Sequence, residues 1–508
     1  MSIKKNIVAS YVSQIYVTLV GILALPFYIK YMGAEAYGLV GFFTMLQTWF
    51  ALLDLGLTPT IARETARFRA GSYDNLSYRR LFRALSVIFL GIALMGGGLL
   101  FLLSDYLSTH WLKINKLDLN EVQFAIQIMA ISVALRWMTG LYRGVVTGSE
   151  RLVWLSGFNS GIASLRFLGI FPVIWYFGAT PTVFFQYQLL IALVEFFGLW
   201  FKSRQLLPKL DIAQEKIVGW SIKPIKSVLG FSLSIALTGG IWVFVTQTDK
   251  LIMSNLLSLE NYGYFTLAVL VAGGIMMISA PISGALTPRM VKLDAESNQE
   301  ELIQLYRKST QLVTVLAGSV AIILATFSKP LLYLWTGDQH IANVAAETLT
   351  LYAIGYGFLA VSAFPFYLQY AKGKLKLHIV GSLLYITTLL PLLFILTHNF
   401  GMQGAGYTWL IVNILYFFTW TGYVHHIYLK GIHFSWLIKD VIQPIIISII
   451  VAILLSKPIR TDVNQLELLI ILVISTTIVI TISVLSSSYL RSILFSIFNS
   501  KYAKYKTT

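Results

Sequence analysis

Three basic side chains lie inside apolar segments of this sequence, where their type and position indicate a binding function. Arg136, Arg166 and Lys250 each lie within a long apolar stretch. An ionisable side chain at the centre of a bilayer costs about 2.5–3.5 kcal/mol on insertion scales. A water-filled cavity, snorkelling to an interface or a private ion pair would each compensate that cost. Because the planar guanidinium group matches phosphate oxygens, we favour a cavity for an anionic solute.

Other polar residues follow these cations at helical spacing. Arg136 and Arg143 share one helical face, Asn159 and Arg166 share another, and Gln247 lies beside the face that ends at the third cation. Such stripes either line a wet cavity or join helices through buried hydrogen bonds. For the hydroxyl groups of the stripes alone, helix joining is the preferred interpretation.

Three acidic residues also fall within or at the ends of apolar segments. Asp54 lies close to Gly56, where a hydrogen bond at a helix break would explain it without any further function. Asp249 is adjacent to the third cation. Glu195 has no partner that the sequence identifies. Three cations with one or two acids favour an anionic over a cationic solute.

The composition requires that these residues lie on membrane-spanning helices. Of the 508 residues, 57% are apolar and 12% are Asp, Glu, Lys or Arg, whereas soluble domains carry about 25% charged residues. At about 20 residues per crossing, the apolar content is sufficient for about fourteen spans. The predicted class is an all-α polytopic membrane protein. The expected spans are near 6–31, 36–61, 82–104, 122–142, 153–177, 183–201, 228–254, 263–288, 310–335, 345–370, 378–397, 405–429, 441–456 and 467–489.

The distribution of Lys and Arg predicts the orientation. An even number of spans places both termini on one side, and the termini with the even-numbered connections hold 29 of the 38 Lys and Arg. The opposite side holds 5, and the others lie within spans. Because Lys and Arg accumulate in cytoplasmic loops, both termini are expected in the cytoplasm. Topology thus explains most of the net charge of +16, and no nucleic acid partner is expected.

An internal duplication divides the spans into two similar sets. Tyr37-Gly38 and Thr58-Pro59 recur as Tyr262-Gly263 and Thr287-Pro288, at offsets of 225 and 229. Six spans separate the copies, so both halves enter the membrane the same way, as parallel repeats related by an axis along the membrane normal. The expected organisation is a six-helix lobe over 1–210, a second six-helix lobe over 211–435, and two extra helices with a basic cytoplasmic tail over 436–508.

The sequence does not contain the residue patterns that thiol chemistry, metal binding or ATP hydrolysis would need. The sequence has no Cys, and its seven His are scattered without metal-ligand spacing. It has no Gly-rich phosphate loop, so neither a metal, a cofactor nor direct use of ATP is expected. A membrane polysaccharide polymerase or glycosyltransferase is the alternative from another class, but it needs a sizeable outer loop with catalytic residues. The longest outer connection, 105–121, is short. We therefore expect no enzyme.

Several segments resemble a known family. GAEAYGLVGFF at 33–43 and LLDLGLTPTIARETARF at 52–68 are similar to the start of O-antigen or polysaccharide flippases. TDKLIMSNLLSLENYGYFTLA at 248–268 and PISGALTPR at 281–289 are similar to the family's second-lobe segments. The resemblance extends over the whole chain and fades in the last hairpin. The family belongs to a superfamily that also contains lipid II flippases and multidrug and toxin extrusion transporters.

The resemblance implies a function for the charged residues. It implies a cationic cavity between two lobes, and an undecaprenyl-pyrophosphate-linked oligosaccharide (an O-antigen or capsule repeat unit) moved from the cytoplasmic to the outer leaflet. Coupling to an H+ or Na+ gradient is also implied, and our own hypothesis is that Asp54 or Asp249 takes the ion. Arg63 and Arg289 occupy matching places in the two lobes, and we expect them to help capture the headgroup.

The resemblance further implies the surroundings of the protein. The expected location is the bacterial inner (cytoplasmic) membrane. The polymerase and the chain-length regulator of the same pathway are expected partners, together with the lipid bilayer. An exporter of drugs or of another lipid-linked precursor, with the same fold, is the closest alternative. A pocket for cationic drugs would be lined by acids and aromatic residues, which the excess of Arg and Lys disfavours.

Overall fold

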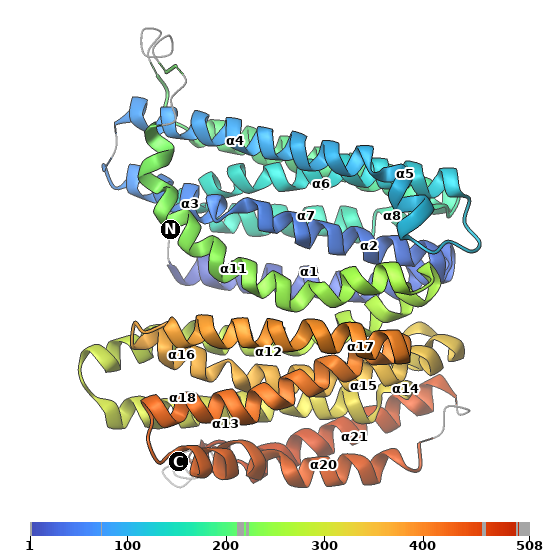
Figure 1. The fold of residues 1–508 in the computed structure, drawn as a ribbon, viewed down its shortest axis with the longest axis vertical. Coiled ribbons are helices and arrows are strands. Elements are labelled where there is room, and N and C mark those ends of the chain that lie inside the picture. Colours follow the sequence, from blue (N-terminus) through green and yellow to red (C-terminus); the bar gives the residue numbers. More distant parts are fainter. Residues whose placement is uncertain are drawn as a thin grey trace, which may run out of the picture. The chain divides into compact units, whose positions relative to one another are not determined.

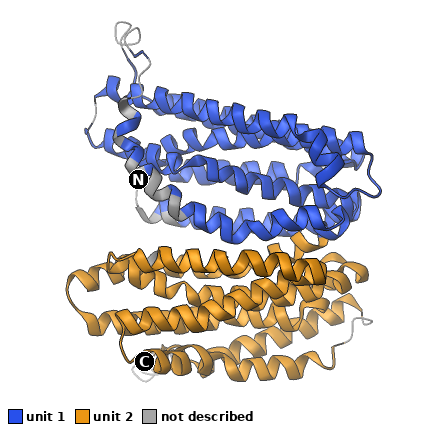
Figure 2. Cartoon of the chain, viewed as in Figure 1, with its two compact units in different colours: residues 1–263 blue, residues 264–508 orange. Residues whose placement is uncertain are grey.

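The computed structural model describes residues 3–72, 74–210, 218–219, 223–459, 464–493 and 496. Helices dominate this part of the chain, and it contains no β-strand apart from an isolated bridge between Lys113 and Ser258. The chain divides into two compact units, Met1–Gly263 and Tyr264–Thr508 (Figure 2). The predicted all-α class is confirmed.

Unit 1 is built from long helices joined by short connections (Figure 1). The helix α1 packs against α7, and α6 packs against α9, α3 and α4. These contacts bring the polar faces of α1, α6, α7 and α9 together. The helices of the unit are α1 (Ile3–Met32), α2 (Ala34–Phe50), α3 (Leu57–Arg69), α4 (Asn75–Leu102), α5 (Ser104–Tyr106), α6 (Leu119–Gly148), α7 (Leu152–Phe167), α8 (Ile170–Phe177), α9 (Pro181–Leu206) and α11 (Lys223–Leu256), with short turns at Ala51–Asp54 and Leu107–Trp111.

Side chains fix where the helices that carry polar residues begin. The Asp118 carboxylate accepts hydrogen bonds from the backbone N–H groups of Asn120 and Glu121, at 2.9 and 3.1 Å, and so caps α6. Thr180 caps α9 in the same way, and Pro181 follows at the first helical position, where its missing N–H is not needed. The caps therefore fix Leu119 and Pro181 as the first residues of α6 and α9.

Unit 2 is also helical throughout its described part. The helix α13 packs against α15 and α20, and α20 packs against α21. The helix α12 (Leu259–Ala295) begins in unit 1 and continues into unit 2. The other helices are α13 (Gln299–Thr326), α14 (Ser328–Thr336), α15 (Gln339–Ser362), α16 (Phe364–Ala371), α17 (Lys376–Leu415), α18 (Thr421–Tyr428), α19 (His433–Trp436), α20 (Gln443–Ser456) and α21 (Gln465–Ser486), with short π-helical turns at Tyr416–Trp420 and Leu437–Ile442.

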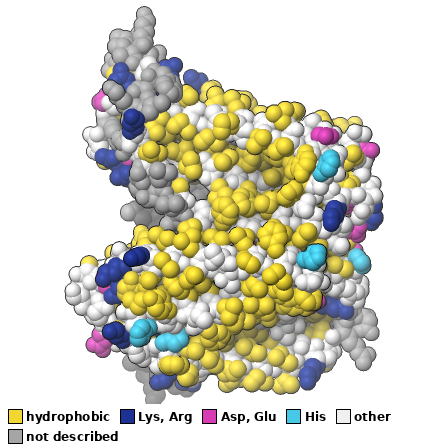
Figure 3. All heavy atoms as spheres, in the orientation of Figure 1, with side chains coloured by type: hydrophobic (Ala, Val, Ile, Leu, Met, Phe, Trp, Pro, Cys, Tyr) yellow, Lys and Arg dark blue, Asp and Glu magenta, His cyan; other side chains and the backbone are white. Residues whose placement is uncertain are grey.

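Twelve helical segments of the described chain are long and apolar enough to cross a membrane. One of them, Lys376–Tyr428, is 53 residues long and is broken at Gly401, whose φ is 55°, so it covers two of the expected spans. The helix α11 coincides with a further expected span, 228–254, but is not among the twelve, so the number fourteen remains a prediction. Apolar side chains cover the long sides of the helices, and charged side chains gather at their ends (Figure 3). The protein is a multi-pass membrane protein.

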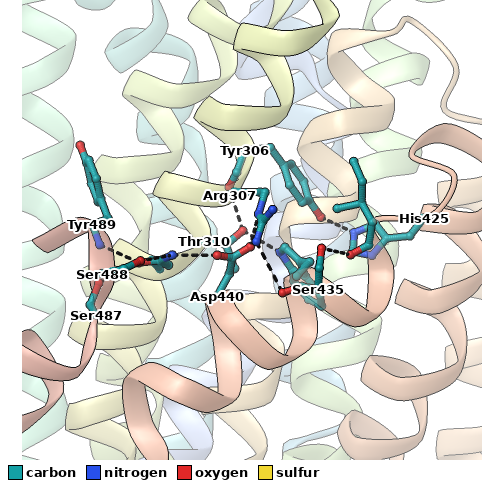
Figure 4. Close-up of polar contacts among 12 residues, drawn as sticks. Tyr306, Arg307, Thr310, His425, Ser435, Asp440, Ser487, Ser488 and Tyr489 are labelled. Atoms are coloured by element: carbon teal, nitrogen blue, oxygen red, sulfur yellow. Dashed lines mark hydrogen bonds and ion pairs between the residues drawn. The ribbon is translucent and has the colours of Figure 1, made fainter.

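A polar cluster joins the last two spans to the rest of unit 2 (Figure 4). We call Arg307, Gln311, Asp440 and Ser487 the hairpin hub. Arg307 Nε and Gln311 Nε2 donate to the two oxygens of Asp440, at 2.5 and 2.7 Å. Ser487 Oγ donates to Gln311 Oε1 at 2.9 Å. Because Asp440 is only 1% exposed, the hub ties α13 to the start of α20 and the end of α21 through a buried charge.

Aromatic and imidazole side chains extend the packing around the hub. Tyr306 Oη lies 2.7 Å from Nε2 of His425, which is fully buried. Trp436 Nε1 donates to Thr310 Oγ1 at 3.1 Å. Figure 4 shows Tyr306 and His425 on one side of Asp440 and the serines after α21 on the other. Side chains from α13, α18 and α19 thus meet between the hairpin and the remainder of the unit.

The predicted division at 210 and 435 remains a proposal. Its first boundary borders residues 211–217, which lie outside the described residues, and the basic tail also falls mostly outside them. The helix α11 belongs to the second lobe in that division, but it packs within unit 1. A reciprocal contact inside unit 1 supports the duplication: a Cβ on Gly38 would lie 2.1 Å from the Leu259 carbonyl oxygen, and one on Gly263 would lie 2.8 Å from that of Ala34. Ala34 and Leu259 each lie four residues before the glycine of their own copy, so the two copies make the same contact with one another's matching residue.

Candidate functional site

A polar cavity of about 440 Å³ lies among α1, α6, α7 and α9 of unit 1. Its position follows from the packing of α1 on α7 and of α6 on α9. Four hydroxyl groups and two amides line it beside two arginines and one glutamate, and the remainder of its wall is apolar. The lining residues are Ser10, Ser13, Gln14, Val17, Thr18, Arg143, Leu152, Leu155, Ser156, Asn159, Ile162, Ala163, Arg166, Phe167 and Glu195.

Two arginines of the cavity share one carboxylate. Arg143 Nη2 lies 3.0 Å from Glu195 Oε1, and Arg166 Nη2 lies 2.8 Å from Oε2. The Glu195 side chain is 9% exposed, and the two arginine side chains are 32% and 25% exposed. Arg143 Nη1 also donates to Asn159 Oδ1 at 2.8 Å. The three charged groups carry a net charge of +1, which favours an anion in the remaining space.

The helices present these side chains because of their spacing. Asn159 and Arg166 are seven residues apart on α7, which is two helical turns, and Ser156 extends the same face. Ser13 Oγ of α1 donates to the Ser156 carbonyl oxygen at 2.8 Å, and Ser160 Oγ donates to Ser13 Oγ at 3.0 Å. These serines join α1 to α7, as predicted for the hydroxyl groups of the stripes.

Sequence reasoning missed two members of this site. The sequence places Arg143 on the face of Arg136 without indicating a partner for it, and it identifies no partner for Glu195. Both carried a signal: Arg143 shares the face of Arg136, and Glu195 is an acid in the middle of an apolar span. When one span carries an acid without a partner, basic residues that share a face on a neighbouring span are candidates for its partners.

Arg136 lies outside the cavity lining. Its Nη1 donates to Gln47 Oε1 at 2.9 Å and its Nη2 to Gln188 Oε1 at 2.8 Å. The guanidinium carbon also lies 5.1 Å from the centre of the Phe43 ring, within the range of a cation–π interaction. Two amides and an aromatic ring thus surround Arg136 among α2, α6 and α9, and its role in binding a solute remains a prediction.

Lys250 and Asp249 form a pair on α11. Lys250 Nζ lies 3.2 Å from Asp249 Oδ1 and donates to the Thr246 carbonyl oxygen at 2.5 Å. The Asp249 side chain is 3% exposed and that of Lys250 is 16% exposed. Gln247 is half-buried on the same helix. The structure therefore keeps these three residues together, on a helix that contributes no residue to the cavity lining.

Asp54 makes the hydrogen bonds expected at a helix break. Its carboxylate accepts from the Thr58 hydroxyl at 2.6 Å and from the Thr58 backbone N–H at 3.2 Å. Leu55 and Gly56 have left-handed backbone conformations between the two helices that the bonds connect. The carboxylate thus stabilises the start of α3, and its role as an ion carrier remains a prediction.

The two arginines expected at the cytoplasmic side are paired at the surface. Arg63 Nη1 lies 3.2 Å from Glu64 Oε1, and the Arg63 side chain is 45% exposed. Arg289 Nη2 lies 3.6 Å from Glu301 Oε2, with both side chains more than half exposed. The Glu64 side chain is fully buried and also contacts Arg67, whereas both partners of the Arg289 pair are exposed, and an exposed pair contributes little to stability. The role of the two arginines in capturing a headgroup remains a prediction.

A second polar feature, which we call the loop latch, closes unit 1 at the end where α1 stops. It joins residues 111–116 to residues 254–260. The Leu259 backbone N–H donates to the Lys113 carbonyl oxygen at 2.9 Å, and Trp111 Nε1 donates to Ser254 Oγ at 2.9 Å. Lys116 Nζ lies 2.9 Å from Glu260 Oε2, and this bond raises the pKa of Lys116.

Glu35 completes the loop latch from the start of α2. Its carboxylate accepts hydrogen bonds from the backbone N–H groups of Asn115 and Lys116, at 2.5 and 2.8 Å. The side chain is almost fully buried. The carboxylate thus fixes the backbone of the loop that contacts the turn between α11 and α12. Within the described residues, no group of three His, Asp or Glu side chains is arranged to hold a metal ion.

The fold and the cavity together define a class: a multi-pass helical membrane protein with a cationic polar cavity among its spanning helices. The sequence model of the family described as "Polysaccharide biosynthesis protein" matches residues 3–294, and the chain belongs to this family. The model of the MatE family matches residues 234–397. The predicted resemblance is thereby confirmed.

Relatives and solved structures agree with this assignment. A Shigella flexneri protein named "Putative O-antigen transporter" is 24% identical over 420 residues, which cover 82% of this chain and 96% of the relative. A Salmonella typhi protein of the same name is 21% identical over 358 residues, covering 70% and 78%. The fold is similar to an inward closed lipid II flippase MurJ, with a TM-score of 0.72, 14% identity and coverage of 96% and 100%. It is also similar to an inward-facing multidrug resistance MATE family transporter, with a TM-score of 0.63, 16% identity and coverage of 82% and 96%.

Proposed function

We propose that this protein is a flippase of the bacterial inner membrane. Its substrate would be an undecaprenyl-pyrophosphate-linked oligosaccharide, an O-antigen or capsule repeat unit, moved from the cytoplasmic to the outer leaflet. Both termini would lie in the cytoplasm, and an H+ or Na+ gradient would drive the cycle. The polymerase and the chain-length regulator of the pathway would use the product.

The cationic cavity among the spanning helices carries this proposal. Arg143 and Arg166 face 440 Å³ of space together with hydroxyl and amide groups. Arginine forks bind phosphate oxygens, and hydroxyl and amide groups bind sugars. The names of the two curated relatives support the same substrate class.

The physical task explains why such a cavity is needed. A charged, sugar-bearing headgroup cannot cross hydrocarbon, whereas its lipid tail is most stable there. Polar side chains inside a lobe replace the water around the headgroup while the tail stays in the bilayer. Rocking of the two proposed lobes would then open the site to the other side.

An exporter of drugs or of another lipid-linked precursor is the remaining candidate. A pocket for cationic drugs requires acids without basic partners, but the acid of this cavity, Glu195, is shared by two arginines. The net positive charge of the cavity therefore favours anionic lipids over cationic drugs.

Proteoliposomes test the proposed function directly. Purified protein is reconstituted with an undecaprenyl-pyrophosphate-linked oligosaccharide, and a glycosidase added outside reports which leaflet holds the sugar. We expect protein-dependent movement under an imposed H+ or Na+ gradient. If the sugar stays in its leaflet under both gradients while a rhodamine dye is transported, the protein is a drug exporter instead.

The loop latch is expected to open during transport. Residues paired in a β-bridge lie about 5 Å apart, a spacing that suits a disulfide. In Lys113→Cys/Ser258→Cys, oxidation should cross-link the loop latch and stop transport, and a reductant should restore it. The protein has no Cys of its own, so each single variant is a clean control. Complete cross-linking with undiminished transport would show that the loop latch need not open.

Two acids are proposed as carriers of the coupling ion. Asp54→Asn and Asp249→Asn remove the charge but keep the size of the side chain. If either carboxylate binds the ion, transport in everted vesicles should become insensitive to the gradient in that variant. The exposed acid Glu150 provides the control Glu150→Gln. Unchanged gradient dependence in both Asp variants would exclude both residues as carriers.

A further inference from the structure

The two arginines of the cavity hold Glu195 in the way they would hold a phosphate. Each guanidinium contacts a different oxygen of the same carboxylate, at 3.0 and 2.8 Å. Charge-assisted contacts of this kind are what an arginine pair makes with the oxygens of a diphosphate. The carboxylate thus occupies the position between the cations where a tetrahedral oxyanion would fit.

The arginines keep donors that the carboxylate does not use. A guanidinium group has five N–H donors. Arg143 uses others on Asn159, whereas Nε of Arg166 is buried and makes no hydrogen bond within the described part of the chain. Next to these groups the cavity has room for a ligand and is lined by the hydroxyl groups of Ser10 and Ser13. The pair can therefore accept more oxygens than Glu195 supplies.

We infer that a diphosphate group binds between Arg143 and Arg166 by displacing Glu195, and that the displaced carboxylate takes up one proton. Glu195 would thus act as an internal counter-ion that links anion binding to protonation. The inference rests on the proposed function in one respect, because the diphosphate would be that of the lipid-linked substrate. An inorganic diphosphate carries the same chemistry, and the experiment separates the two sources.

The proton follows from the surroundings of Glu195. The side chain is 9% exposed, and a buried carboxylate that loses its cations is strongly destabilised in its charged form. One proton from the aqueous phase converts it to the neutral acid, with no other bond made or broken. When the diphosphate leaves, the arginines recover the carboxylate and the proton is released.

The charged groups around Glu195 are few. The helix α6 contributes Arg143, and it also carries Arg136, which interacts electrostatically with both Arg166 and Glu195. The helix α7 contributes Arg166. The cavity-lining residues of α1 are uncharged. No described acid other than Glu195 lines the cavity, so the link to protonation depends on this residue.

Calorimetry on the purified full-length protein tests the inference. Inorganic pyrophosphate is titrated at one pH in two buffers that differ in their enthalpy of ionisation, and the difference in heat gives the number of protons taken up. The variant Glu195→Gln keeps the shape of the side chain but cannot take up a proton. Protonation of pyrophosphate itself is common to both proteins, so the difference between them isolates Glu195.

We expect the wild type to take up about one proton more per bound pyrophosphate than Glu195→Gln. The variant should bind about tenfold or more tightly, because the ligand no longer competes with a carboxylate for charge-assisted hydrogen bonds. Glu150→Gln, which changes an exposed acid near the end of α6, should behave like the wild type. Equal proton uptake in Glu195→Gln and the wild type, or weaker binding by the variant, would overturn the inference. If Glu195→Gln does not fold, the wild type alone still tests the inference. A heat of pyrophosphate binding that is the same in both buffers would overturn it.

A second titration with a short-chain prenyl diphosphate in detergent identifies the source of the ligand. Binding of the prenyl compound alone assigns the cavity to a lipid headgroup, and equal binding of both compounds assigns it to the diphosphate itself. Either result supports the inference, whereas binding of neither refutes it. Proton-linked binding without sugar movement in proteoliposomes would contradict the proposed function only, and sugar movement without diphosphate binding would contradict this inference only.

Discussion

Replacing Arg166 with alanine is expected to slow transport of the lipid-linked oligosaccharide by about tenfold to a hundredfold. The substitution removes one of the two guanidinium groups that face the cavity and leaves Glu195 with Arg143 alone. Hydrogen bonds to charged groups contribute about 1.5–3 kcal/mol each, or roughly tenfold to a hundredfold in affinity. The initial rate in proteoliposomes at low substrate concentration should fall by about that factor.

Two variants make this result specific. Arg166→Lys keeps the charge but loses the planar fork, so it should retain only part of the rate. Arg151 is exposed at the start of α7 and does not line the cavity, and Arg151→Ala should transport normally. Thermal unfolding of all three proteins shows whether the fold is retained. A full rate in Arg166→Ala would contradict a cationic binding cavity at this place.

Replacing Asp440 with alanine is expected to have the largest effect on stability. Asp440 is the buried acceptor for Arg307 and Gln311 in the hairpin hub. Removing one partner of a buried ion pair costs about 3–5 kcal/mol when the other partner stays buried. Because the Arg307 side chain is 30% exposed, we expect a cost near the lower end of that range. We expect the midpoint of thermal unfolding in detergent to drop by several degrees and the yield of folded protein to fall.

Asp440→Asn is the matched variant for this prediction. Its amide oxygen can still accept one of the two hydrogen bonds, so it should lose less stability than the alanine variant. The exposed capping residue Asp338 accepts from the backbone of His340 at 2.7 Å, and Asp338→Ala should cost only about 1 kcal/mol. An unfolding midpoint for Asp440→Ala equal to that of the wild type would show that the hairpin does not depend on the hub.

The spans could be predicted from the sequence because their cause is local. Long apolar runs must form helices in a bilayer, where every backbone polar group needs an internal partner. The hydrogen bonds of Asp54 could also be anticipated, because Thr58 is only four residues away. The reciprocal glycine contact appeared in advance as a repeated Tyr-Gly pair.

The composition of the cavity could not be predicted, because it depends on which faces of the helices meet. In a membrane both the lipid-facing and the buried surfaces of a helix are apolar, so the hydrophobic pattern fixes the rotation of a helix poorly. Arg143, Arg166 and Glu195 lie on three different helices, and only the packing of α6, α7 and α9 shows that they meet. For the same reason the sequence could not show that Arg136 binds Gln47 and Gln188.

The loop latch also constrains the order in which the protein is made. Lys113 and its contact at Leu256 are 143 residues apart, so the loop latch cannot form until the ribosome has completed the turn before α12. Glu35 lies much nearer to Asn115 along the chain and can hold the loop backbone earlier. We therefore expect Glu35 to order this loop before its partners at 254–260 have been synthesised. The turn between α11 and α12 can then bind to a loop that is already ordered. Loss of Glu35 should therefore slow assembly and also lower the stability of the folded protein.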